Sequence, residues 1–171
     1  RRSLKGWRRL VPARSRRALP FSVWCAVIYL LRERNELQMC LFVLISPSSY
    51  ARPGECLGVQ RGERVPPAQG VTKFWSLIIC PEEREKRTKL NASDDSVLLD
   101  SPWCRWMGPL FEALTAGDSE APLWDFGHPC LAKALKEVNT RLSLPSLVPY
   151  QLRHSGASID RVSGRRTQDE I

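Results

Sequence analysis

The sequence has few of the residues that build metal sites and nucleotide-binding loops. It contains two histidines, His128 and His154, and none of its six cysteines lies in a CxxC or CxxxC pair. It also lacks GxGxxG, GxxxxGK[ST], HExxH and GxSxG patterns. These absences exclude zinc ribbons, thioredoxin-like motifs and the common signatures of dinucleotide-binding proteins, P-loop proteins, metalloproteases and serine hydrolases. We therefore expect no metal site.

Long apolar runs are missing as well. The longest mostly apolar stretch, 19–31, has 13 residues, whereas a membrane-spanning helix needs ~20. No apolar run is followed by a small-residue cleavage site, so we expect neither a secretory signal nor a membrane partner. The chain begins with Arg1 rather than Met and ends at Ile171, and we interpret it as a fragment of a longer protein.

The composition is that of a globular domain with all its excess charge at one end. The net charge is +8, and residues 1–17 hold eight basic residues and no acid. A basic arm of this kind suits a polyanion, because each neutralised phosphate releases condensed counterions. We predict a basic arm over 1–17, followed by one domain over 18–171. The DNA contacts expected in the arm are Arg8, Arg9, Arg14, Arg16 and Arg17. The alternative interpretation of the arm is a solvated, flexible leader.

Hydrophobic periodicity predicts a mainly helical α+β domain with a small three-stranded antiparallel sheet between helices. Helices are expected over 20–31, 36–45, 103–114, 129–142 and 150–162, with a short one after Arg52. Pro47 is expected to break the second helix. Strands are expected around 57–60, 73–80 and 96–100, the last two paired as a hairpin. We expect the cysteines to be buried, reduced thiols and Trp75, Trp103, Trp106 and Trp124 to lie in the core.

Two short motifs with a sheet between them carry the functional hypothesis. The first is Tyr-Ala-Arg-Pro-Gly-Glu, with Arg52 and Glu55, and the second is Tyr-Gln-Leu-Arg-His-Ser-Gly, with Tyr150, Arg153 and His154. In their order, spacing and intervening pattern these residues resemble the catalytic domain of the tyrosine recombinases, or phage-integrase family, in its divergent eukaryotic form. The resemblance spans most of the chain from about Trp7 onward.

The resemblance implies breakage and rejoining of double-stranded DNA, as in site-specific recombination or integration. Arg52 and Arg153 would clamp one phosphate, because guanidinium groups are planar, always charged and bidentate. Lys89 would protonate the leaving 5′ oxygen. Glu55 would hold Arg52, and His154 would orient the clamp or pack behind Arg153. A tyrosine would form the 3′ phosphotyrosine link that conserves the bond energy, so no cofactor is implied.

The sequence departs from the family pattern at two places. Tyr150 stands where the second box usually begins with His, and a phenol is a poor base near neutral pH. The family's nucleophilic tyrosine follows the second arginine, whereas the tyrosines here are Tyr29, Tyr50 and Tyr150. We therefore expect this chain alone to be inactive. Either the nucleophile lies further along a longer protein, or the chain is a catalytically inactive DNA-binding remnant. A helical protein-interaction domain is a third hypothesis.

Further expectations follow from these hypotheses. A full-length enzyme would act as an assembly of several copies on DNA, as the resemblance implies. The DNA partner and the reduced thiols predict an intracellular, nuclear location. Lys89 lies in one charged connection with Lys86 and Arg87, and a solvated lysine is the competing interpretation there. The phosphate clamp has structural alternatives as well. Arg52 would then pair only with Glu55 at a helix start, and Arg153 would be a surface charge.

Overall fold

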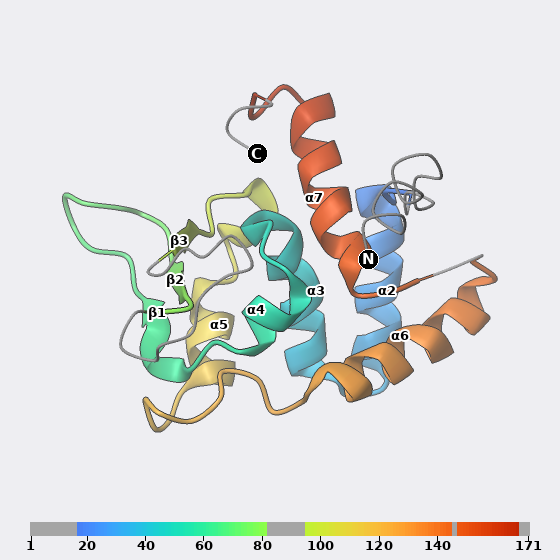
Figure 1. The fold of residues 1–171 in the computed structure, drawn as a ribbon, viewed down its shortest axis with the longest axis horizontal. Coiled ribbons are helices and arrows are strands. Elements are labelled where there is room, and N and C mark those ends of the chain that lie inside the picture. The colour runs from blue at the N-terminus through green and yellow to red at the C-terminus, as the bar shows by residue number, and fades with distance from the viewer. Residues whose placement is uncertain (1–16, 82–94, 145–146, 168–171) are drawn as a thin grey trace, which may run out of the picture.

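Three helices packed side by side form the centre of the molecule (Figure 1). The structure is a computed structural model and describes residues 17–81, 95–144 and 147–167. The central helix α3 (Leu37–Ser49) lies between α2 (Phe21–Glu33) and α7 (Tyr150–Val162). Nearly every residue of α3 is buried, because both neighbours pack against it. Only one stripe of α2 is buried, at Trp24, Val27, Leu30 and Leu31.

The end of α3 differs from the sequence prediction. We expected Pro47 to end this helix, but the helix continues through Pro47 to Ser49. Proline removes one backbone hydrogen bond from a helix, which normally bends or ends it. Here residues 46–49 are all buried, and Gly156 of α7 leaves room for the Pro47 backbone, so tertiary packing overrides the local preference.

A three-stranded antiparallel sheet lies at the left of the molecule in Figure 1, on the other side of α3 from α6 (His128–Leu142). Its strands are β1 (Arg64–Val65), β2 (Ser76–Ile79) and β3 (Asp95–Leu98), in the order β1-β2-β3. The predicted hairpin of the last two strands is confirmed, with Leu77 opposite Val97. The predicted strand at 57–60 is wrong, since Leu57 ends α4 and Gln60 forms only an isolated bridge to Pro122. The backbone N–H of Gln60 donates to Glu63 at 2.7 Å, which favours a short 3₁₀ turn η1 (Arg61–Glu63) before β1.

The predicted helix over 103–114 is divided in two. A short 3₁₀ helix η3 (Pro102–Cys104) is followed by α5 (Gly108–Thr115). Residues 105–107 belong to neither helix. In this connection Met107 is buried, whereas the side chain of Trp106 is 64% exposed. The core position predicted for Trp106 is therefore wrong. Trp124 is buried, and Trp75 and Trp103 pack against the core from partly buried positions.

The remaining helices complete a mainly helical α+β fold, as predicted. The short helix α4 (Pro53–Leu57) begins at the predicted Arg52, and α6 (His128–Leu142) packs against both α2 and α4. The α7 helix has the predicted bounds. Within the described ranges, no helix is long and apolar enough to cross a membrane.

The six cysteines all lie in the described part of the chain and form no disulfide. Cys56 and Cys104 are buried, as predicted, whereas Cys25 and Cys130 are exposed. The expectation that every thiol is buried is therefore wrong. Cys25 lies in an apolar run, but the helical period turns it outward while Trp24 and Val27 face the core.

Candidate functional site

A hollow of about 670 Å³ lies where α4, α6 and α7 begin. It combines Arg52 from the start of α4, His128 from the start of α6 and Tyr150 from the start of α7. Its full lining is Arg52, Pro53, Gly54, Glu55, His128, Ala132, Val148, Pro149 and Tyr150. The two sequence motifs, which are far apart in the chain, therefore meet in one concave surface.

Arg52 is held at the hollow by the way in which α4 begins. It is the N-cap residue, with extended backbone angles, and Pro53 follows in the first turn. The Glu55 carboxylate accepts hydrogen bonds from the Arg52 backbone N–H at 2.8 Å and from its Nη1 at 2.7 Å. This is the glutamate half of a capping box, and the same carboxylate also holds the arginine side chain. The hydrogen bond that Arg52 donates to Glu55 raises the pKa of Arg52, and contact with Tyr150 adds to this rise, so Arg52 remains a cation.

Tyr150 is the first residue of α7, and its ring contacts His154 one turn later. The two rings are edge-to-face, with centroids 4.9 Å apart. Gln151 fixes this helix start, because its Oε1 accepts from the Val148 backbone N–H at 2.9 Å. The same side chain donates through Nε2 to the Arg17 carbonyl at 3.2 Å, which ties the end of the basic arm to α7. His154 therefore buttresses Tyr150 rather than lining the hollow itself.

Arg153 is on α7, three residues after Tyr150. It is partly buried and is not among the residues that line the hollow. Burial raises the pKa of the Cys56 thiol in α4 to about 11, and the positive charge of Arg153 acts against this rise. A shared phosphate between Arg52 and Arg153 stays a prediction.

Most of the other predicted site residues are not described by the structure. Lys89 and the arm residues Arg8, Arg9, Arg14 and Arg16 lie outside the described residues. Arg17 is exposed and contributes only its backbone carbonyl to the contact with α7. The sequence pattern assigned no site role to His128 and missed its place in the hollow. Pro129 marks a helix start there, but no local signal places that start opposite Arg52.

The arrangement favours an anion. Two helices of full length, α6 and α7, begin at the hollow, and helix N-termini carry partial positive charge and free N–H groups. The hollow also contains the Arg52 guanidinium beside a phenol. Within the described residues, no group of three His, Cys, Asp or Glu side chains is arranged to hold a metal ion.

The comparisons with known proteins add no relative to this picture. No family model matches the sequence, and no curated protein matches it either. The resemblance to tyrosine recombinases therefore stays a prediction from the residues of the two motifs.

Proposed function

We propose that this chain supplies the phosphate-binding part of a tyrosine-recombinase-like domain, which breaks and rejoins double-stranded DNA. The observation that carries the proposal is the meeting of Arg52 and Tyr150 in one hollow at the starts of three helices. Arg153, three residues after Tyr150 on α7, is the second cation of the proposed pocket.

The chemistry of strand breakage explains why such residues would gather. Attack on a phosphodiester places additional negative charge on the non-bridging oxygens in the transition state. Preorganised guanidinium groups stabilise that charge more strongly than they stabilise the ground state, and losing one comparable donor costs ~3–4 kcal/mol in other enzymes. Glu55 restricts Arg52 to one orientation, so the cation does not have to be reoriented during the reaction.

None of the three tyrosines is assigned as the nucleophile. Tyr29 is on α2, outside the hollow. The hydroxyl of Tyr50 donates a hydrogen bond to the Asp160 carboxylate. Tyr150 precedes Arg153, whereas the family's nucleophile follows its second arginine. In the proposed reaction this chain binds the phosphate and stabilises the transition state. The alternative is a DNA-binding remnant without activity.

The test compares two arginines of the same helix. The variant Arg153→Ala and the control Arg161→Ala each remove one positive charge from α7, but Arg161 is exposed in its last turn. The affinity for a short fluorescein-labelled duplex is measured by anisotropy over a range of salt concentrations. Loss of a phosphate contact lowers the slope of log K against log[salt] by ~0.9. We expect this change for Arg52→Ala and Arg153→Ala, and none for Arg161→Ala.

The outcomes separate the hypotheses. Equal slopes for Arg153→Ala and Arg161→Ala would refute the phosphate pocket. If removal of residues 1–17 abolishes all DNA affinity, the arm alone binds DNA and the helical interaction domain is favoured. Enzyme and remnant are distinguished in the full-length protein, where only the enzyme forms a covalent protein–DNA adduct and Arg153→Ala abolishes it.

A further inference from the structure

Tyr50 has an uncommon backbone conformation immediately before the first motif. It follows α3 with φ 48° and ψ 6°, in the left-handed region that residues other than glycine seldom adopt. Its hydroxyl donates a hydrogen bond to Asp160 Oδ2 on α7. The guanidinium of Arg166 lies over its ring, 5.1 Å from the ring centroid. A strained residue persists only where surrounding contacts hold it, and Tyr50 is held at both its hydroxyl and its ring.

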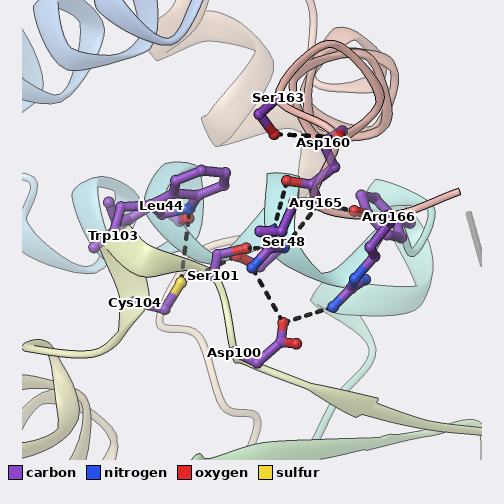
Figure 2. A network of polar contacts seen from close by, with 11 residues as sticks. Leu44, Ser48, Asp100, Ser101, Trp103, Cys104, Asp160, Ser163, Arg165 and Arg166 are labelled. Carbon is purple, nitrogen blue, oxygen red and sulfur yellow. Dashed lines mark hydrogen bonds and ion pairs between the residues drawn. The ribbon is translucent and has the colours of Figure 1, made fainter.

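The acceptor, Asp160, is a fixed point of the structure. It is 1% exposed and belongs to the polar network that connects the end of α7 to the segment after β3 (Figure 2). Its two carboxylate oxygens accept from Arg165 Nε at 2.9 Å and from Arg165 Nη2 at 2.7 Å. Arg165 Nη2 also donates to Ser101 Oγ at 2.8 Å. A buried carboxylate with charge-assisted, bidentate hydrogen bonds has little freedom to move.

The turn after α7 brings Arg166 to Tyr50. Gly164 has φ +66°, which lets the chain reverse, and the Arg165 backbone N–H then donates to the Asp160 carbonyl at 3.0 Å. Arg166 is anchored by Asp100, with 2.6 Å between its Nη2 and Asp100 Oδ1 (Figure 2). The cation over the Tyr50 ring is therefore also held in place.

The segment from Pro47 to Arg52 contacts α7 at three levels. The Pro47 backbone lies against Gly156, the Tyr50 hydroxyl reaches Asp160, and the Arg52 side chain reaches Tyr150 at the start of the helix. Tyr50 and Arg52, two residues apart, thus extend toward opposite ends of α7. Fixing Tyr50 fixes the backbone from which the Arg52 side chain leaves.

We propose that Tyr50 is a positioning residue, which acts through its hydrogen bond to Asp160 to hold Arg52 in register with Tyr150 and Arg153. This inference rests on the proposed function for its consequence in DNA binding, but the positioning itself is a property of the ligand-free protein. The expected consequence is that the Arg52 guanidinium loses its single orientation when the Tyr50 hydroxyl is removed.

The experiment compares Tyr50→Phe with the matched control Tyr29→Phe. Tyr50→Phe keeps the ring beneath Arg166 and removes only the hydroxyl, while Tyr29 is 58% exposed on α2. The first measurement is the ¹⁵N–¹H signal of Arg52 Nε in the ligand-free protein. We expect this signal to shift or broaden in Tyr50→Phe and to stay unchanged in Tyr29→Phe. If Tyr50→Phe does not fold, Arg166→Gln is measured in the same way, because it releases the ring of Tyr50 at a partly exposed position.

A double-mutant cycle measures the functional consequence with the labelled duplex. We expect Tyr50→Phe to weaken DNA binding about tenfold, in line with the loss of one well-oriented hydrogen bond to a charged group. In an Arg52→Ala background it should have no further effect, because Tyr50 acts through Arg52. Two results would overturn the positioning role. One is an unchanged Arg52 Nε signal in Tyr50→Phe, and the other is that the two substitutions lower the free energy of DNA binding additively. A shifted signal together with wild-type DNA affinity for Arg52→Ala would instead refute the proposed function and leave the positioning intact.

Discussion

Substituting Gly156 by alanine tests the closest helix contact in the structure. Gly156 is buried in the middle of α7, where glycine destabilises a helix by about 1 kcal/mol relative to alanine. An ideal Cβ at this position would lie 1.9 Å from the Pro47 carbonyl oxygen and 2.6 Å from its carbonyl carbon. Real Cβ atoms essentially never approach within 3.0 Å, so α3 and α7 would have to separate by at least the difference, 3.0 − 1.9 = 1.1 Å.

The magnitude follows from two opposing contributions. Alanine favours the helix by up to ~1 kcal/mol. Overpacking a buried site costs typically ~1–3 kcal/mol, and this site should lie at or beyond the upper end, since the neighbour is backbone and cannot change rotamer. The expected net loss is therefore about 2 kcal/mol in the free energy of unfolding. For a domain of this size, that loss lowers Tm by roughly 4–8 °C.

The assay is urea and thermal unfolding followed by circular dichroism, with Gly54→Ala as the matched control. An added Cβ at Gly54 would have nothing within 4 Å, and its backbone is helical. Gly54→Ala should therefore leave the stability unchanged or raise it by up to ~1 kcal/mol. An unfolding free energy of Gly156→Ala equal to that of the wild type, at an unchanged m-value, would refute the close approach of α3 and α7.

Two further predictions concern the turn after α7 and the thiols. Gly164 has φ +66° and open space around it, so Gly164→Ala should cost ~1–2 kcal/mol of unfolding free energy from backbone strain alone. Gly164→Asn should cost less in the same urea titration, and equal stability of all three proteins would contradict the left-handed turn. Burial raises the pKa values of Cys56 and Cys104 to about 11, so at pH 8 both stay protonated and unreactive. Mass spectrometry after brief iodoacetamide treatment should find labels on the exposed Cys25 and Cys130. Cys56 and Cys104 should be labelled only after urea is added. Prompt labelling of Cys104 would be inconsistent with the described core.

Elements defined by a strong local pattern were predictable from the sequence. The helices α6 and α7 combine an apolar stripe with prolines at their starts, and both lie within one residue of the predicted bounds. The strand pair β2 and β3 was recognisable from aromatic and β-branched residues, although both ends of each strand were displaced. Periodicity and breaker residues act over a few neighbours, so they are visible in a single sequence.

Elements decided by distant contacts were not predictable in this way. Pro47 should end a helix, yet Gly156, far along the chain, accommodates its backbone. The 57–60 segment has a strand-like composition, but the hydrogen bond from Gln60 to Glu63 favours the 3₁₀ turn that displaces the strand to 64–65. The place of His128 in the hollow depends on how α6 packs against α4, which no local pattern encodes.

The charge of the hollow separates two contributions to DNA binding. Glu55 offsets the charge of Arg52 directly, so the hollow has a low net charge, and the starts of α6 and α7 would add to its attraction for a phosphate. Most of the long-range attraction must then come from residues 1–17, which carry eight positive charges and no acid. The arm would accelerate encounter with any duplex in a salt-dependent way, whereas the hollow would act only at short range on one phosphate. Under the proposed function, a pocket of low net charge in the same chain as a strongly basic arm would select a phosphate by geometry after electrostatic capture.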